Sequence, residues 1–272
     1  MGRPPPHPGR PHISFAAPRP SGEGGPSKAT ATVRGAITLR LRTMSADIRV
    51  VTGAAGRVNV SCWDAEGPVR LEQHGDRVEV ELPGGARHHG SVDLEVPSGS
   101  GLELQSLSGD VLLRGSYGEV MIKTVSGDVS VDAATRVQVK SVSGDVRIDK
   151  AAGETRVRTV SGSARVGGTR SDQRVSLETT NGKVEWRGTC ARGCRLDAAA
   201  VSGDVELVLD GKSSFELRAV SQSGELVDRL GLEKPQTRDR QGSGKRLEAR
   251  YGKAEGVIDV STYSGDFRLG KK

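Results

Sequence analysis

The sequence predicts an all-β protein, a single-stranded parallel β-helix (β-solenoid) with about 17–21 residues per rung and a right-handed coil. Short segments in which apolar and polar residues alternate run through the chain, as in half-buried strands. A Ser-Gly-Asp turn, intact or altered, recurs from residue 108 onward. Aromatic residues make up only 3% of the chain and glycines number 37, which favours a thin core of valine and leucine over a wide one.

Residues 1–30 predict a disordered tail. The segment MGRPPPHPGRPHISFAAPRPSGEGGPSK is rich in Pro, Gly and Arg, so it cannot bury enough apolar surface to offset the entropy of ordering. It does not resemble a secretory signal, because it has no continuous apolar core. The chain has no run of roughly 18 apolar residues and therefore no predicted transmembrane segment. We expect a cytoplasmic protein as the sequence is written, or an envelope or surface protein if the start codon is misassigned.

Residues 31–100 predict irregular β rungs or an N-terminal cap. Apolar residues recur there at a spacing of two, the pattern of strands with one buried face. Turn residues separate the segments. The apolar positions are Ile37, Leu39 and Leu41; Ile48 and Val50; Val58 and Val60; Val69 and Leu71; Val78, Val80 and Leu82; and Val92, Leu94 and Val96.

Residues 101–272 predict the regular solenoid. Its corner glycines are Gly109, Gly127, Gly144, Gly162, Gly182, Gly203, Gly224 and Gly265. They are separated by 18, 17, 18, 20, 21, 21 and 41 residues, so the last interval covers about two periods. This interval indicates a degenerate rung or one replaced by a loop. The charged segment EKPQTRDRQGSGKR (233–246) predicts a surface loop within it.

Apolar residues recur at the same distances from each corner and so form columns along the repeat. A Ser-Gly-Asp tripeptide that occurred by chance would not bring such columns with it. Equal spacing lets each strand lie parallel to its equivalent in the next rung, with the rest of the coil serving as the crossover. We also expect a variable loop after the two strands of each rung, such as residues 132–136 or 167–174. Three residues after the first corner residue lie Val111, Val129, Val146, Ala164, Val184, Val205, Leu226 and Phe267.

The corner residues have structural roles in this prediction. The glycines fit a turn that needs positive φ or close backbone approach. Aspartate follows glycine at Asp110, Asp128, Asp145, Asp204 and Asp266, where it either closes the turn by accepting backbone hydrogen bonds or binds calcium between rungs. Ser163 and Lys183 interrupt this column, which favours the first role and no metal. Hydroxyl side chains precede the corner and predict hydrogen bonds between rungs, at Ser106, Thr124, Ser141, Thr159, Thr179, Ser221 and Thr262.

The remaining reactive residues predict no catalytic site and no cofactor. Cys190 and Cys194 could be incidental thiols, a small disulfide or two metal ligands, and the first is favoured because no second ligand pair lies nearby. All five histidines precede the repeats. The net charge of +6 comes from 40 basic and 34 acidic residues that are interspersed, so we expect no specific nucleic-acid partner.

The repeat resembles a known bacterial family. The motifs VKSVSGDVRI (139–148), VSGDVELVL (201–209) and VSTYSGDFRLG (260–270) are similar to those of the DUF4097 β-strand repeats, a family of unknown function often labelled putative adhesins. The resemblance implies a single-stranded β-helix without enzymatic activity. It also implies a place outside the membrane for many members and a link to envelope stress for some.

Three functions follow as hypotheses. The first is a non-enzymatic scaffold or adhesin-like protein that binds an unidentified protein or glycan, linked to the cell envelope. The second is self-association head to tail through unpaired strand edges, since only Gly270, Lys271 and Lys272 follow the last rung. The third, least favoured because the acidic residues do not cluster, is a solenoid enzyme that acts on polysaccharide.

Overall fold

The computed structural model describes residues 26–64, 67–83, 90–168, 170–237 and 244–271. Its regular structure is all β, with 23 strands in these ranges. No helical span suited to a bilayer occurs among them. Residues 1–25 of the expected tail lie outside the described ranges. Its last part is not tail, because Ser27–Thr32 form strand β1, whose main chain pairs with β4 (Arg57–Cys62).

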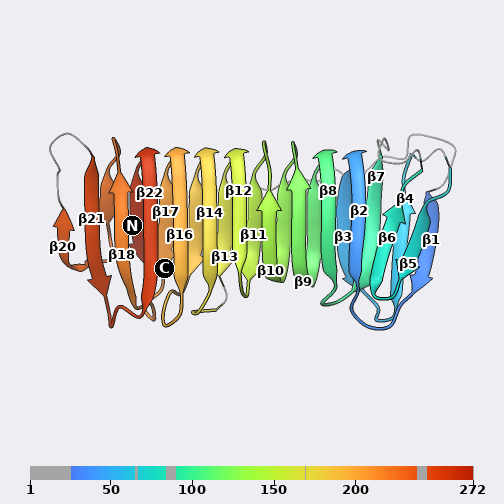
Figure 1. The fold of residues 1–272 in the computed structure, drawn as a ribbon, viewed down its shortest axis with the longest axis horizontal. Helices are drawn as coiled ribbons and strands as arrows, with labels where there is room; N and C mark the ends of the chain where they lie inside the picture. Colours follow the sequence, from blue (N-terminus) through green and yellow to red (C-terminus); the bar gives the residue numbers. More distant parts are fainter. Residues whose placement is uncertain (1–25, 65–66, 84–89, 169, 238–243, 272) are drawn as a thin grey trace, which may run out of the picture.

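Each rung has two strands joined at the corner, so the stack has two faces back to back (Figure 1). Face A is made of the strands that lead into the corners. In stack order it contains β5 (Arg70–His74), β6 (Arg77–Glu81), β2 (Thr38–Ser45), β8 (Gly101–Ser108), the ends of β9 (Val111–Thr124) and β10 (Val129–Lys140), β12 (Thr155–Ser161), β14 (Arg174–Asn181), β16 (Arg195–Ser202), β22 (Gly256–Ser264), β18 (Phe215–Ser221), β21 (Lys245–Tyr251) and β20 (Glu233–Thr237).

Face B is made mainly of the strands that leave the corners. In stack order it contains β1, β4, β7 (Ser91–Pro97), β3 (Asp47–Gly53), the starts of β9 and β10, β11 (Val146–Ala151), β13 (Ala164–Gly168), β15 (Val184–Gly188), β17 (Val205–Leu209), β23 (Phe267–Lys271) and β19 (Leu226–Asp228).

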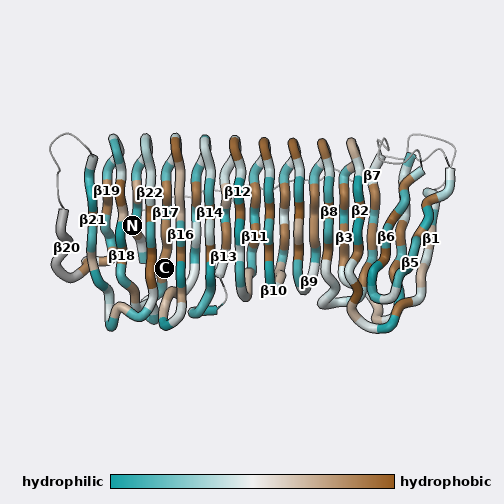
Figure 2. Tube along the Cα trace, in the orientation of Figure 1, coloured by the Kyte–Doolittle hydropathy of each residue, from teal (hydrophilic) through white to brown (hydrophobic). Residues whose placement is uncertain are grey.

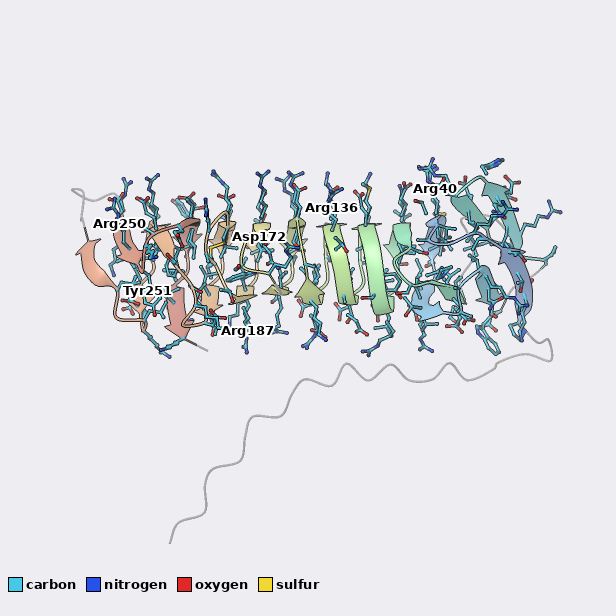
Figure 3. The ribbon with its side chains drawn as sticks, turned by 90° about the horizontal axis from the view of Figure 1, so that it is seen from below. Arg40, Arg136, Asp172, Arg187, Arg250 and Tyr251 are labelled. Atoms are coloured by element: carbon cyan, nitrogen blue, oxygen red, sulfur yellow. A yellow bond between two sulfur atoms is a disulfide. The ribbon has the colours of Figure 1, made fainter. Side chains whose placement is uncertain are left out.

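Equivalent residues of successive rungs lie over one another in parallel register. Val129 pairs with Val146, which pairs with Ala164, and the column continues through Val184 to Val205. All of these side chains are buried, so the interior is the narrow apolar layer that the columns predict. Outward side chains leave the two faces in opposite directions, as Arg136 and Arg187 do in Figure 3.

The stack does not follow chain order at its ends. At the C-terminal end, β22 lies between β16 and β18, and β23 lies between β17 and β19, all in parallel (Figure 1). At the other end, β2 lies between β6 and β8, and β3 lies between β7 and β9. The final rung is therefore inserted inside the stack. The 41-residue spacing before Gly265 arises because the strands β20 and β21, which pair antiparallel, lie between the last two corners.

Antiparallel strands close both ends. At one end, β21 pairs antiparallel with β18, and β20 pairs antiparallel with β21. At the other end, β4 pairs antiparallel with β7, β1 with β4, and β5 with β6. The last rung in the sequence was expected to end the stack with an unpaired edge. This expectation is wrong, because β18 and β19 pair with the two strands of that rung. Pro235 lies in the outermost strand β20 and has no N–H to offer a further strand.

Strands occur in two segments where loops were expected. In the segment 233–246, residues 233–237 form β20 and residues 245–246 begin β21, because Leu247 and Ala249 are buried and β21 covers the edge of β18; residues 238–243 of the expected loop lie outside the described ranges. Residues 132–136 belong to β10, because Ala133 keeps its pairing with Ser116 and Lys150 in the rungs on either side. Charge and turn propensity were outweighed in both cases by main-chain pairing in the stack.

The region before residue 101 contains one full rung. Leu39 pairs with Leu102 and Leu41 with Leu104 on face A, and Ile48 pairs with Val111 on face B. The boundary expected at residue 100 is therefore no break in the stack, and the irregular part is limited to the strands beyond β2 and β3.

A disulfide joins Cys190 and Cys194 in the turn between β15 and β16, with an S–S distance of 2.01 Å. The favoured expectation of incidental thiols is thus wrong. The N–H of Ser214 donates to the carbonyl of Cys190 (2.7 Å), and that of Val257 donates to the carbonyl of Cys194 (3.0 Å). The bonded turn therefore anchors the turns that lead into β18 and β22, next to the inserted rung.

Val139→Asp should lower the free energy of unfolding by about 3 kcal/mol or more, because it buries an unpaired carboxylate. Val139 is 0% exposed, whereas its neighbour Gln138 points outward. Gln138→Asp is the matched control and should cost less than about 1 kcal/mol. Urea denaturation measures both variants. Equal costs would show that Val139 does not face a dry interior.

Replacing Cys190 and Cys194 together by alanine should lower the free energy of unfolding by about 2 kcal/mol, the loop-entropy contribution of so short a ring. Burial, and then Asp93, raise the pKa of the remaining thiol, Cys62, to about 11, so it should resist alkylation in the native protein. A reductant should destabilise the wild type in urea and leave the double variant unchanged. A thiol assay of the denatured, unreduced wild type should detect one thiol, and three would contradict the bond.

Candidate binding surface

The corner glycines stack directly on one another. A Cβ atom on Gly144 would lie 2.2 Å from the carbonyl oxygen of Gly127, and one on Gly127 would lie 2.2 Å from that of Gly109. At all eight corners this distance is 1.8–2.3 Å, far inside van der Waals contact. Five corner glycines also have φ between 108° and 142°, in the region that favours glycine: Gly109, Gly127, Gly144, Gly162 and Gly182. At Gly203, Gly224 and Gly265 the close approach alone requires glycine.

The aspartate column links neighbouring rungs. The N–H of Asp128 donates to Oδ1 of Asp110 (2.8 Å), and the N–H of Asp145 donates to Oδ1 of Asp128 (2.8 Å). The same bond joins the N–H of Asp266 to Oδ1 of Asp204 (3.0 Å). Each carboxylate therefore bonds the next corner, whereas the expected role was closure of its own turn.

The column is interrupted where the sequence departs from aspartate. Ser163 still donates its N–H to Asp145 (2.8 Å), but it has no carboxylate to offer Lys183. Lys183 instead forms an ion pair with Glu206 on face B. Within the described ranges no group of three or more His, Cys, Asp or Glu side chains is arranged to hold a metal ion.

The hydroxyl column bonds main-chain carbonyls at the corners, in some rungs within the rung and in others between rungs, as expected. Ser106 Oγ donates to the carbonyl of Ser108 (2.7 Å), and Thr124 and Ser141 repeat this bond within their own rungs. Thr179 donates instead to the carbonyl of Gly162 in the preceding rung (3.1 Å). These buried hydroxyls thus satisfy the carbonyls that the tight corner turns inward.

The sequence also contains a first corner that we did not predict, Ser45-Ala46-Asp47. The N–H of Asp110 donates to Oδ1 of Asp47 (2.9 Å), so this corner begins the aspartate column. A Cβ at a corner points toward the preceding rung. The N–H of Asp47 donates to the carbonyl of Gly90 (3.2 Å), and residues 84–89 just before it lie outside the described ranges. Leu39, Leu41, Ile48 and Val50 stand at the same offsets as in later rungs and could have revealed it.

Face B carries a charge-balanced depression of about 530 Å³ around Glu185. The Glu185 side chain is only 5% exposed and lies 3.1 Å from Arg165 Nε and 2.5 Å from Arg187. Burial raises the pKa of Glu185, but hydrogen bonds from Arg165 and Arg187 outweigh this, so its pKa is held below the ordinary value. Each arginine that lines the depression has a carboxylate partner: Arg165 and Arg187 pair with Glu185, and Arg147 pairs with Asp149. The cluster is thus better suited to stabilising the face than to binding a charged ligand.

Face A carries an elongated groove over β14, β16, β22 and β18. It consists of two adjoining depressions of about 550 and 380 Å³ that share Glu178, Ala199, Val220 and Ser261. Ala199 and Ser261 are outward residues of β16 and β22, and their short side chains leave the floor low. We call this the face A groove.

The ends of the face A groove differ in chemistry. Tyr263, 64% exposed, borders it near the corners together with Val160 and Val201. At the other end lie Asp197 and Asp259, which share Arg195 at 3.1 and 3.8 Å. The groove therefore combines an apolar, aromatic edge with charged groups of both signs, as binding sites for polar organic ligands do.

Comparisons with known proteins identify a family and a set of folds. The sequence model of the family described as Toastrack DUF4097 matches residues 36–270. No curated protein matches the sequence.

Similar solved structures cover most of the chain at low identity. A "putative adhesin" from Bacteroides fragilis is 12% identical with a TM-score of 0.47, over 92% of this chain and 98% of that one. One from Parabacteroides merdae is 11% identical with a TM-score of 0.37, over 91% and 97%. A "putative lipid binding protein" from Parabacteroides distasonis is 8% identical with a TM-score of 0.32, over 91% and 98%. These values are too low to carry a function to this chain.

Gly144→Ala should lower the free energy of unfolding by about 2–4 kcal/mol, because it adds both an unfavourable φ and a collision with the Gly127 carbonyl. Gly35→Ala is the matched control: Gly35 has φ of 80° but no atom within 4 Å of its Cβ position, so it should cost only about 1 kcal/mol. Thermal and urea unfolding measure both. Equal costs would refute the close approach of neighbouring corners.

Proposed function

The chain belongs to the Toastrack DUF4097 family, and from this premise we propose that it is a non-enzymatic β-solenoid scaffold that binds an extended glycan in the face A groove. The observation that carries the proposal is the groove itself. It crosses strands of several neighbouring rungs of a rigid stack, so a chain-like ligand can contact several rungs at once.

The lining of the groove supports a glycan as the ligand. Tyr263 offers a flat apolar ring with a polar tip, which suits a ligand that is apolar on one side and hydroxylated on the other. Thr180, Ser261 and Gln222 add neutral hydrogen-bonding groups beside it. The charges of the rim are of both signs, so a polymer with one strong charge is less well matched.

The carboxylates of the groove support binding without catalysis. Asp197 and Asp259 are paired across β16 and β22, and both form ion pairs with Arg195. A glycosidase instead needs one protonated and one ionised carboxyl group on opposite sides of the scissile bond. A polysaccharide-active enzyme is the less favoured alternative for this reason.

The disulfide supports a place in an oxidising compartment. Disulfides such as Cys190–Cys194 persist in secreted and envelope proteins and are rare in the cytosol. We therefore favour the cell envelope over the cytoplasm. We also retain the right-handed coil as part of the proposal, in line with the usual sense of parallel crossovers.

A glycan array followed by calorimetry tests the proposal. Ser261→Arg should fill the groove and weaken binding of the best glycan at least about 100-fold, which corresponds to about 2.7 kcal/mol. Ser130→Arg is the control, because Ser130 is also an outward serine on a strand but lies on face B. Equal binding by both variants and the wild type would contradict the site. Turnover of a bound polysaccharide would contradict the non-enzymatic role.

A further inference from the structure

A row of exposed apolar side chains runs along the corners, outside the core and mostly outside the face A groove. Each precedes the first residue of its corner, and each is 40–64% exposed. In Figure 2 brown tips of the trace mark most of these rungs along the edge where the face A strands end. We call it the corner ridge; in stack order it comprises Met44, Leu107, Val125, Val142, Val160, Val201 and Tyr263.

The corner ridge is straight because the corners stack in register. The N–H of Ser126 donates to the carbonyl of Leu107 (2.9 Å), and that of Ser143 donates to the carbonyl of Val125 (2.7 Å). Rungs repeat at about 4.8 Å, so the ridge from Met44 to Tyr263 extends over roughly 34 Å. Thr180 and Gln222 occupy the same position in two other rungs, which shows that the fold accepts polar residues there. The corner geometry therefore does not require the apolar side chains.

Opposite charges flank most of the first five rungs of the ridge, with one neutral residue on each side, Gln105 and Ser163. On the face A side lie the exposed cations Arg42, Lys123, Lys140 and Arg158. Of these, Arg158 pairs with Glu178, and the other three have no ion-pair partner within the described ranges.

The other flank of the ridge is acidic. On the face B side lie the corner carboxylates Asp47, Asp110, Asp128 and Asp145. Their Oδ1 atoms accept the bonds from the next corner, and none of the four has an ion-pair partner in the described part of the chain. The ridge is thus an apolar line with a basic row on one side and an acidic row on the other.

We propose that the corner ridge binds a second copy of this chain, side by side and parallel, about a two-fold axis that runs along the stack. This operation places each ridge residue against the same residue of the other copy. It also turns the basic side of one copy toward the acidic side of the other. Lys123 and Lys140 of one copy then lie opposite the aspartate column of the other copy.

An antiparallel pair lacks this complementarity. It would bring face A of one copy against face A of the other. Lys123 would then oppose Glu178, but Lys140 would oppose the like-charged Arg158, and Arg42 would oppose the neutral Ser261. The aspartates would oppose Ser163 and Lys183, but also Asp204 and Asp266. The charges therefore favour the parallel arrangement.

The size of the surface is adequate for a specific dimer. The ridge with its two flanking rows spans about six residues across the corner, or roughly 17 Å, over a length of roughly 34 Å. The resulting area of roughly 600 Å² per copy, or 1,200 Å² in total, reaches the lower end of specific interfaces. The aspartate column argues against an anionic membrane as the partner, because it would be repelled. The dimer is argued independently of the glycan site, but Val160, Val201 and Tyr263 border both surfaces, so a bound glycan and a second copy would compete for this end of the ridge.

Sedimentation of the purified chain tests the interface. The wild type should be a dimer at roughly 100 µM, and V125K/V142K should weaken it at least about 100-fold, because each copy would bring two cations to a shared apolar line. Val51→Lys and Val257→Lys are matched controls, since these valines are 37% and 36% exposed but lie off the ridge, and both should leave the dimer intact. S261R, which blocks the glycan groove, should also leave it intact.

A cysteine cross-link tests the parallel direction. Leu107→Cys should form a disulfide with the same residue of the second copy under mild oxidation, since parallel pairing places the two side by side. In an antiparallel pair centred on the ridge, Leu107 would lie near Val201, and the two copies of residue 107 would be roughly 24 Å apart. Val51→Cys is the control and should not cross-link.

Three results would overturn the proposal. The first is a wild type that stays monomeric at this concentration. The second is a dimer that survives V125K/V142K, or one in which L107C fails to cross-link. The third is a monomeric wild type that cosediments with anionic vesicles and loses this binding in V125K/V142K, which would identify the ridge as a membrane contact. Retained circular dichroism and retained glycan binding in V125K/V142K would show that the substitutions had not unfolded the chain.

Discussion

The close approach of neighbouring corners is the constraint on which this fold depends. Each corner glycine covers the carbonyl of the corner before it, at a distance that leaves no room for a side chain. A shift of one rung by one residue would place Asp128 or Ser126 over that carbonyl and would turn the valine column outward. The corners therefore set the register of the whole stack, and the aspartate and hydroxyl columns add hydrogen bonds that depend on the same alignment.

A register fixed by the main chain leaves the outward rows free to vary. Short residues at Ala199 and Ser261 produce the groove of face A, whereas the depression on face B is lined by charged pairs around Glu185. The corner ridge arises in the same way, from one apolar choice repeated in successive rungs. Binding surfaces in such a fold are thus patterns along the stack, each made of residues about one rung apart in sequence.

Local repetition explains what the sequence could predict. The valine columns and glycine corners were predictable because each rung repeats the same offsets, and the structure places Val129, Val146 and Val205 in one buried column. The order of rungs at the ends was not predictable, because β22 has equally suitable apolar columns for either neighbour. The groove and ridge were not predicted for a different reason: they consist of outward residues, which the repeat does not require to be of one type. The apolar character of positions such as Val125, next to the corner, is nevertheless visible in the sequence.

The inserted last rung offers the most direct test that corners stack in the order described. Gly265 covers the carbonyl of Gly203, and Gly224 covers that of Gly265, so Ser202 lies beside Ser264 and is separated from Ser223 by a whole rung. In the S202C/S264C variant, mild oxidation should form a disulfide, which mass spectrometry of a digest would detect; in S202C/S223C it should not. A bond in the second variant and none in the first would contradict the account.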